Sequence, residues 1–383
     1  MARKSKYFAF LLSWLMIGGI LILAPIARVS SAAGVSSALE KVIEAARKEG
    51  QLDLMVRSST GEKGARELSA AFNKRFGLNI RVNADLAGME SQKFNQAVTE
   101  IKAGIPPTFD LMQGMTDNIL GLKGVDGAEQ IENWEAFLAQ IAPEAYKVRE
   151  RVSPSILAGY GFLWLTQTRG LIYNSKLISL QELPKTWKDK GDPKYRGAFS
   201  VMPFTSLSLS GLLKYDKEEL LEIIRSWGRN KRQVLTFAAG VERMMLGELK
   251  FLYGNAGYYF GHKAMDPNAP IGLRFFEDLT PTDPVMYVVR KGARHPEAAK
   301  LFALWATGAE ASDIFNKHSP EVENLVLGKG PTSEAMLNIL KERNIKPVSW
   351  FDSPETLEKF RWFETKEGKE YAQAIARAQR EGK

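Results

Sequence analysis

The sequence predicts an α/β fold divided into two lobes, and three observations lead to that prediction. Segments with strand-like and helix-like patterns alternate along the chain, as they do in proteins whose parallel sheets are covered by helices. The clearest unit spans residues 51–83 and indicates a strand, a polar loop, a helix and a second strand. Removal of an N-terminal export segment would leave about 350 residues, which is more than a single hydrophobic core usually holds.

Residues 1–33 are predicted to be a signal peptide, which implies a periplasmic protein. Basic residues precede the apolar run "YFAFLLSWLMIGGILILAP", and the small residues of "VSSAAG" follow it. Pro25 and this small polar segment favour cleavage near Ala32 or Ala33. The alternative is an uncleaved anchor, because about twenty apolar residues suffice to span a bilayer.

Composition excludes several classes of protein and site. Cleavage would remove four basic residues and no acidic one, so the formal net charge would fall from +8 to +4. Lys and Arg are scattered among Asp and Glu without a long basic block, so we expect no nucleic-acid partner. The chain has no cysteine, which excludes disulfides, thiolate metal sites, a cysteine nucleophile and the lipid-modified cysteine of bacterial lipoproteins.

The first half of the chain begins with a helix and continues as strand–helix units. Apolar residues form a helical stripe in "ALEKVIEAARKEG", and Gly50 is expected to cap this helix. A strand, "LDLMV", and the polar loop "RSSTGEKG" follow, and then a helix and the strand "NIRVN". After the next helix and a Pro-Pro break, "FDLMQG" is expected to form a short buried strand.

Two polar loops are expected at the carboxyl ends of strands in this half. Ser58, Ser59 and Thr60 follow the first strand, and Gln113 lies where the strand "FDLMQG" runs into the second loop. Open α/β sheets bind ligands at such loops, and helix starts offer free N–H groups to anions. We therefore assign these four residues to a ligand site, with helix capping as the alternative role for the hydroxyl groups.

The second half continues the α/β pattern. The segment "GFLWLTQTRGLIYNSKLI" is expected to supply two strands around a turn. A loop punctuated by Pro and Gly leads to the strand "AFSVM" and to a polar turn that carries Thr205 and Ser206. "FLYGN" and "VMYVVR" have strand patterns, whereas "KEELLEIIRSWGRN" and "HPEAAKLFALWATG" have helical periodicity.

Three longer segments carry a resemblance to a known family. They are "LEKVIEAARKEGQLDLMV", then "TRGLIYNSKLI" with "LPKTWKDKGDPKYRGAFSVMPF", and last "APIGLRFFEDLTPTDPVMYVVRKGARHPEAAKLFALW". In this order, and across nearly the whole mature chain, they resemble the extracellular solute-binding proteins of ABC importers. The similarity is to the branch that includes the periplasmic ferric-ion-binding proteins.

The resemblance implies a type 2 periplasmic-binding-protein fold, in which each lobe is a mostly parallel sheet flanked by helices and two strands form the hinge. It places residues 38–166 and 286–337 in the first lobe, and residues 167–285 and 338–383 in the second. The hinge crossings fall in "TQTRGLIYN" and "DPVMYVVRK". The implied function is capture of a small solute in the cleft and its delivery to an ABC permease, by a protein that we expect to be a monomer.

The resemblance also assigns residues of the second lobe to the ligand. Tyr258 and Tyr259 fall where ferric-binding members carry adjacent iron-ligating tyrosines. Arg169 matches a position that helps to hold the synergistic anion of those members, and Thr205 and Ser206 sit where hydroxyl and backbone groups surround that anion. Fe³⁺ prefers oxygen ligands, and its charge can convert a phenol, whose usual pKa is about 10, into a phenolate.

The first lobe departs from the ferric pattern. The loop "RSSTGEKG" has neither the His nor the Tyr that ferric-binding members often carry there, and the second loop offers Gln113. A third tyrosine of other members is replaced by the apolar stretch around Leu209. An organic or oxyanionic solute is therefore favoured, and Fe³⁺ is the alternative cargo, with Tyr258 and Tyr259 as its ligands.

Other interpretations of the same residues stay open. The tyrosine pair can serve packing, and Arg169 can form a structural ion pair where an anion is otherwise expected. We expect no ligand role for His295 or His318. No HExxH, P-loop, GxGxxG or Ser-His-Asp order stands out, so an enzyme or a sensor subunit on the same fold is less favoured, and no cofactor is expected.

Overall fold

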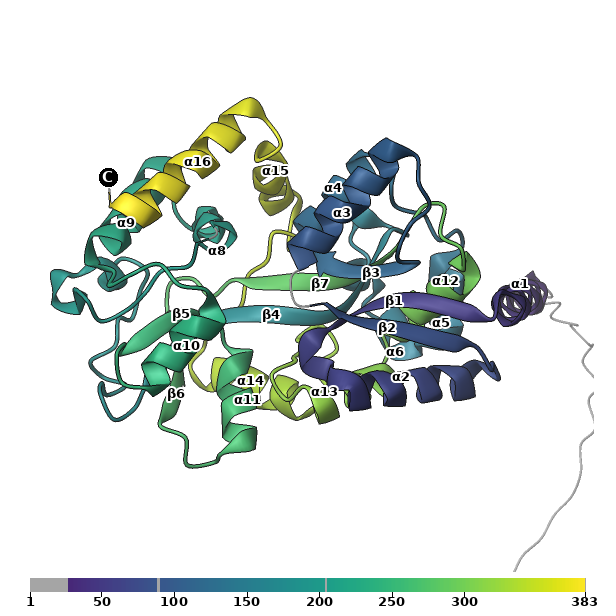
Figure 1. Ribbon diagram of the computed structural model, residues 1–383, viewed down its shortest axis with the longest axis horizontal. Helices are drawn as coiled ribbons and strands as arrows, with labels where there is room; N and C mark the ends of the chain where they lie inside the picture. The colour runs from purple at the N-terminus through teal and green to yellow at the C-terminus, as the bar shows by residue number, and fades with distance from the viewer. Residues whose placement is uncertain (1–26, 88–89, 204, 383) are drawn as a thin grey trace, which may run out of the picture.

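The computed structural model describes residues 27–87, 90–203 and 205–382, which form two lobes side by side (Figure 1). Most of the predicted signal peptide, residues 1–26, lies outside the described residues. From Ala27 onward the chain is already helical, as part of α1 (Ala27–Glu49). Within the described part of the chain, no helix is both long enough and apolar enough to cross a membrane.

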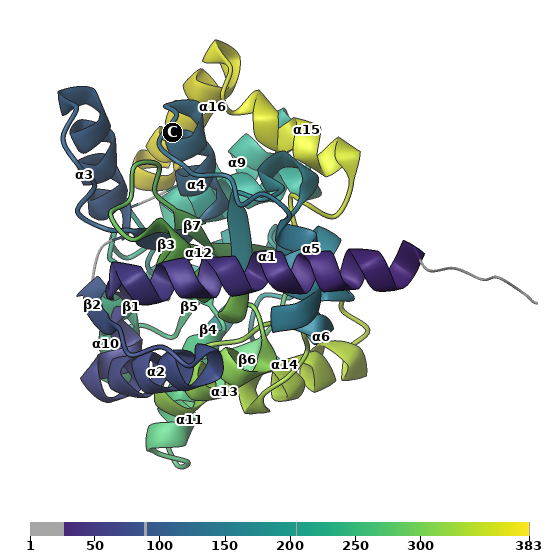
Figure 2. The ribbon, with the colours of Figure 1, turned by 90° about the vertical axis from the view of Figure 1, so that its right-hand side faces the viewer.

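Helix α1 ends where the sequence predicts. Gly50 has a φ of 70°, a left-handed conformation that glycine adopts without a steric penalty. Its N–H donates to the carbonyl oxygen of Ala46 at 3.3 Å, and the chain then turns into the first strand. Leu39 and Ala46 are buried, and the helix lies across the first lobe (Figure 2) against α12 (Pro296–Trp305).

In the described part of the chain, seven strands are hydrogen-bonded in the order β2–β1–β3–β7–β4–β5, with β6 paired to β4. Their bounds are Gln51–Arg57 (β1), Arg81–Ala87 (β2), Leu111–Met115 (β3), Gly161–Asn174 (β4), Phe251–Asn255 (β5), Ile271–Arg274 (β6) and Thr282–Val289 (β7). β1 is parallel to β2 and β3, whereas β7 is antiparallel to β3 and β4, and β5 and β6 are antiparallel to β4. The α/β class is confirmed. The parallel pairs among these strands lie in the first lobe, and isolated parallel bridges join Phe199 to Phe251 and Val201 to Val234 in the second.

Strand β4 connects the two lobes. It is one strand of 14 residues, so the prediction of two strands around a turn is wrong. Its residues 161–168 pair with β7, and its residues 169–174 pair with β5 and β6. The polar segment that suggested a turn stays in the strand because its side chains have buried partners: the hydroxyl of Thr168, for example, lies 3.2 Å from that of Thr282.

Helices cover both faces of the first-lobe strands, with α3 and α4 on one side and α2 and α13 on the other (Figure 1). Besides α1 and α12, this lobe contains α2 (Gly61–Phe76), α3 (Glu90–Ala103), α4 (Thr116–Gly124), α5 (Trp134–Ile141), α6 (Pro143–Tyr146), α7 (Arg149–Val152) and α13 (Ala309–His318). In its core, the Phe72 ring lies 5.2 Å from Phe302 and 5.7 Å from Trp305. These aromatic contacts join α2 to α12.

The second lobe has its own core, which includes Trp187, Trp227 and Tyr253. The other helices of the described residues are α8 (Ser206–Leu209), α9 (Lys217–Asn230), α10 (Phe237–Met245), α11 (Gly257–Met265), α14 (Pro331–Glu342), α15 (Pro354–Trp362) and α16 (Lys366–Glu381). The last of these packs on α9 (Figure 1). The C-terminal helices therefore cover the second lobe.

The predicted lobe boundaries run through elements of secondary structure. The boundary between residues 166 and 167 lies inside β4. The boundary at residue 337 lies inside α14, whose Met336 and Leu340 pack with Leu273 and Phe275 of the second lobe. The assignment of each segment to a lobe stays a prediction, and β4 belongs to both.

A buried ion pair ties α3 to β7 in the first lobe. The Nη1 atom of Arg290 lies 3.1 Å from Oε2 of Glu100, and both side chains are almost fully buried. Glu100→Ala would leave the guanidinium buried without its partner and should lower the free energy of unfolding by about 3 kcal/mol. Glu367→Ala, which removes an exposed partner of Lys217, is the control and should cost less than about 1 kcal/mol. Equal losses in urea denaturation would contradict this.

Candidate functional site

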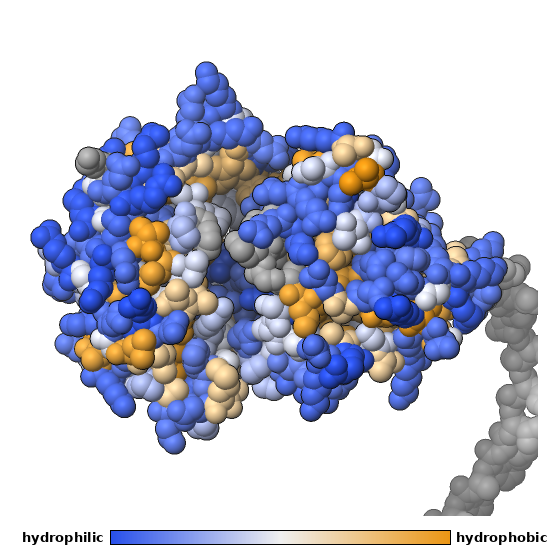
Figure 3. Space-filling view, viewed as in Figure 1, coloured by the Kyte–Doolittle hydropathy of each residue, from blue (hydrophilic) through white to orange (hydrophobic). Residues whose placement is uncertain are grey.

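A cleft lies between the lobes on the face shown in Figure 3. On the first-lobe side, β1 leads into the single turn η1 (Ser58–Thr60), and β3 leads into α4. The second lobe supplies α8 and the start of α11, while β4 and β7 cross between the lobes (Figure 1). The cleft therefore meets the carboxyl ends of parallel strands, where open α/β sheets bind ligands.

The three hydroxyl residues after β1 differ in their exposure. Ser58 is exposed, whereas Oγ of Ser59 accepts a hydrogen bond from Ser319 at 3.0 Å. Thr60 is buried, and its Oγ1 has no hydrogen-bond partner in the described part of the chain. Ser58 is thus the most accessible of the three.

Arg57 was not predicted as a site residue, although it ends β1 directly before these hydroxyls. It lies within electrostatic range of the second lobe: burial raises the pKa of Tyr258, and the charge of Arg57 partly offsets that rise. No ion pair joins Arg57 to another described residue. A cation at a strand end was visible in the sequence, but nothing there showed which groups face it.

The structure separates Gln113 from the other predicted ligand residues. Its side chain is fully buried in β3, opposite Tyr287 of β7. Thr205 and Ser206 lie across the cleft at the start of α8, where the Thr205 carbonyl accepts the N–H of Ser208 at 2.8 Å. Ser206 is exposed and lines an interlobe pocket. Of these residues, Ser206 is the one with a side chain at that pocket.

Arg169 forms an ion pair at the crossing of the two shared strands. Its Nε and Nη2 atoms both donate to Oδ2 of Asp283, at 3.1 and 2.8 Å. The arginine is 6% exposed. The predicted anion site is therefore occupied by a carboxylate of the chain itself, which is the structural alternative that the sequence left open.

Glu323 lies beside this ion pair, with 1% of its surface exposed. Its Oε1 accepts the N–H of Thr168, and Oε2 has no hydrogen-bond partner among the described residues. Burial raises the pKa of Glu323 to about 7, although the Thr168 bond and the charges of Arg57 and Arg169 oppose the rise. A carboxyl group that titrates near neutral pH therefore sits where the lobes join.

Tyr258 and Tyr259 lie in the first turn of α11 and are both half-buried. The Tyr258 ring packs edge-on against Phe237 with 5.0 Å between centroids, and that of Tyr259 packs against Phe260 at 5.1 Å. Successive helix residues point about 100° apart. Accordingly, Tyr258 lies in range of Arg57, whereas Tyr259 lies in range of Tyr173. The two phenols face different surroundings.

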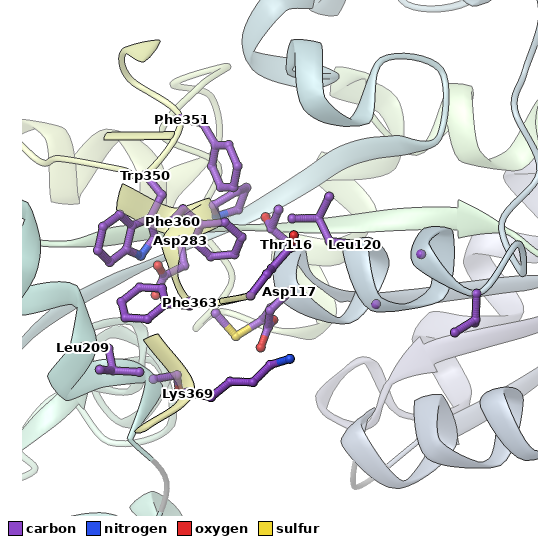
Figure 4. A pocket seen from close by; sticks show the side chains of 17 residues that line it. Thr116, Asp117, Leu120, Leu209, Asp283, Trp350, Phe351, Phe360, Phe363 and Lys369 are labelled. Atoms are coloured by element: carbon purple, nitrogen blue, oxygen red, sulfur yellow. The ribbon is translucent and has the colours of Figure 1, made fainter. Parts of the chain in front are cut away.

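A pocket of about 560 Å³ lies between the lobes (Figure 4). Its first-lobe wall runs along α4, and Asp283 and Pro284 of β7 also line the pocket. The opposite wall is aromatic and comes from the C-terminal segment: Trp350, Phe351, Phe360 and Phe363. Sequence reasoning missed this wall, because the aromatic residues lie far from the strand ends along the chain.

Asp117 is the acidic group of the first-lobe wall. It lies in the first turn of α4, and its side chain is open to the cleft. The protein packed around it nevertheless raises its pKa, and the charge of Asp283 adds to the rise, while the N–H of Asn118 opposes it. No ion pair joins Asp117 to another described residue. The pocket thus holds a carboxyl group without a cationic partner.

Asp53, Asp110 and His295 form the one cluster of His and acidic side chains with metal-like spacing in the described residues. It lies at the amino ends of β1 and β3, at the edge opposite the cleft. Asp110 already accepts from the N–H groups of Asp53, Arg294 and His295, and its Oδ2 lies 2.7 Å from Nδ1 of His295. The oxygen atoms are therefore engaged in holding α12 on the strands.

A protein-family model matches most of the chain. Residues 67–316 match the model for bacterial extracellular solute-binding proteins. No curated protein matches the chain.

Comparison with solved structures shows the same fold at low sequence identity. Iron-bound HitA from Pseudomonas aeruginosa is 17% identical, covers 77% of this chain and 99% of its own, and has a TM-score of 0.56. The spermidine/putrescine substrate-binding protein PotD from Streptococcus pneumoniae is 14% identical, with 87% and 99% covered and a TM-score of 0.57. An ABC transporter protein from Rhodopseudomonas palustris is 17% identical, with 86% and 99% covered and a TM-score of 0.60.

Glu323 should make stability depend on pH. Its pKa of about 7 in the folded state exceeds the usual value of about 4.3, so its contribution is complete at low pH and is lost as pH rises through 7. Glu323→Gln keeps the acceptor for Thr168. Between about pH 4 and pH 8 the wild type should lose roughly 3 kcal/mol of unfolding free energy relative to this variant.

Urea denaturation at several pH values measures this difference. The control is Glu132→Gln, which removes an exposed carboxylate of the first lobe. If both variants follow the wild type in parallel across this range, Glu323 does not titrate as described.

Proposed function

The chain belongs to the bacterial extracellular solute-binding proteins, and from that premise we propose that it captures a small organic or oxyanionic solute in the interlobe cleft. It then delivers the solute to the permease of an ABC importer. The support is the pocket of about 560 Å³ whose walls come from both lobes and from β7. A solute in this place contacts both lobes at once.

Hinge closure is the proposed mechanism of capture. The chain crosses between the lobes in β4 and β7, and these strands pair antiparallel from Thr168 opposite Thr282 to Gly161 opposite Val288. A solute that touches both walls stabilises the closed form by its higher affinity for that form. The permease then recognises the rims of both lobes, which have the right spacing only after closure.

Export and assembly belong to the same proposal. The basic and apolar N-terminal segment of residues 1–33 directs the chain across the cytoplasmic membrane, and the mature protein works in the periplasm. It acts as a monomer without nucleic acid, and membrane contact occurs through the permease or an uncleaved N-terminal anchor. No catalytic step and no resident cofactor are part of this function.

Ferric iron is the second candidate cargo. Tyr258 supports it, since this phenol lies near the cleft in range of Arg57. If Tyr258 and Tyr259 bound the same metal ion, both phenol oxygens would have to point to one place. Their rings, however, pack against different neighbours. Among the described residues, the cluster of acidic and His side chains lies at the opposite edge of the strands. An organic or oxyanionic cargo is therefore the first choice.

Closure should be visible in solution. A thermal-shift screen of ammonium compounds, phosphonates and carboxylates should find ligands that raise the melting temperature, because a ligand at one hundred times its Kd stabilises the folded form by about 2.7 kcal/mol. Small-angle scattering should then show a smaller radius of gyration with each such ligand. If every ligand that binds leaves the radius unchanged, hinge closure is refuted.

Colour separates the two candidate cargoes. Tyrosinate bound to Fe³⁺ gives a visible charge-transfer band, and the protein mixed with ferric salt and carbonate should stay colourless. Tyr258→Phe and Tyr259→Phe serve as controls. A red or orange protein that loses its colour in both variants would establish iron as the cargo in place of an organic or oxyanionic solute.

A further inference from the structure

The aromatic wall of the interlobe pocket is held in place before any ligand arrives. The ring centroid of Trp350 lies 5.9 Å from that of Phe360 and 5.6 Å from that of Phe363, with edge-to-face geometry in the second pair. The segment is anchored next to the hinge, because the N–H of Thr282 donates to the carbonyl of Val348 at 2.9 Å. The rings therefore form a fixed apolar surface near the start of β7.

The start of α15 adds to this rigidity. Ser353 caps the helix: its Oγ accepts the N–H of Thr356 at 3.2 Å, and the side chain of Thr356 accepts the N–H of Ser353 at 3.1 Å. This capping box fixes the entry angle of the helix that carries Phe360. A preformed wall loses little side-chain entropy when a ligand binds.

Charge is distributed unevenly around this wall. Asp283 is neutralised by Arg169, and Glu364 is an exposed residue of the lining. Asp117 is left without a cationic partner in the described part of the chain, opposite the rings (Figure 4). An ammonium group beside Asp117 would meet a carboxylate on one side and aromatic faces on the other, and both attract cations.

We propose that this pocket takes an organic ammonium ion with one cationic group and an apolar body, the cationic group beside Asp117 and the body on the aromatic wall. This substrate class rests on the proposed function, because the pocket is the interlobe site described there. A linear polyamine fits the lining less well. It needs an acidic partner at each end of the molecule. Asp283 is already paired, and the aromatic wall offers its inner ammonium groups no carboxylate besides the exposed Glu364.

Lys369 supplies a second observation on the same charge. It is an exposed residue of the pocket lining, and its side chain extends toward Asp117 in Figure 4. The two residues belong to different lobes, and no ion pair joins them in this structure. Lys369 therefore competes with a cationic ligand for Asp117, whereas it would assist an anionic ligand.

Binding of 2-phenylethylamine, measured by calorimetry on the full mature chain, tests the proposal. It should bind more tightly than 2-phenylethanol, its uncharged analogue, and more tightly than spermidine or phenylphosphonate. Asp117→Asn should weaken the binding of 2-phenylethylamine by at least about tenfold. The control Asp313→Asn removes an exposed carboxylate of α13 and should leave the affinity unchanged.

Two further variants keep the test decisive if Asp117→Asn folds poorly. Phe363→Leu should weaken the binding of 2-phenylethylamine by several fold, because the substitution removes an aromatic face but keeps an apolar side chain. Lys369→Gln should strengthen the binding of the amine, because the competing cation is gone. Weaker binding of the amine in Lys369→Gln contradicts the proposal.

The remaining outcomes separate this inference from the proposed function. Equal affinity for 2-phenylethylamine and 2-phenylethanol, or an unchanged affinity in Asp117→Asn, overturns the ammonium class. Binding of phenylphosphonate with compaction, but of no ammonium compound, also overturns it and leaves solute capture standing. If no compound of any class binds or compacts the protein, the proposed function fails as well.

Discussion

The ion pair between Arg169 and Asp283 is the interaction on which the arrangement of the lobes depends. It joins β4 to β7 at the crossing between the lobes, where two strands must run through the protein interior with polar side chains. A buried guanidinium or carboxylate alone would be strongly unfavourable, so each group requires the other. Beside them, Glu323 accepts a hydrogen bond from the N–H of Thr168. The crossing is thus a polar region between two apolar cores.

This polar crossing also determines which charged groups of the cleft are available to a solute. Because Arg169 neutralises Asp283, neither group is available as a strong ion-pair partner for cargo. The charged groups left in the pocket are Asp117, Glu364 and Lys369, and the contact area comes from the rings of the C-terminal segment. Recognition then rests on cation attraction and apolar burial. On the η1 side of the cleft, Arg57 and Ser58 offer a cation and an exposed hydroxyl group instead.

Much of the fold was predictable from the sequence because its signals are local. The capping of α1 by Gly50, the first strand–helix–strand unit and the polar loops at strand ends follow from periodicity and from the conformational freedom of glycine. The continuity of β4 was missed. Thr168 and Arg169 stay in the strand because the fold brings their partners, Thr282 and Asp283, beside them.

The candidate site was less predictable, since its parts meet only in three dimensions. Arg169 had two open interpretations, and its partner lies 114 residues further along the chain. The aromatic wall comes from residues 350–363, which contain no strand end and no recognisable motif. Tyr258 and Tyr259 lie in the first turn of a helix. Their different neighbours, however, depend on packing that no local pattern encodes.

Closure of the two lobes around a solute shortens the distance between them, and that distance can be measured. The chain has no cysteine, so spin labels can be placed on Ile105→Cys and Leu246→Cys, exposed sites of the first and second lobes. Pulsed electron resonance should show a shift of their distance distribution on saturation with a binding ligand. The pair Ile105→Cys and Val125→Cys, within the first lobe, should show none. An unchanged interlobe distance at saturation would show that the lobes do not close around the solute.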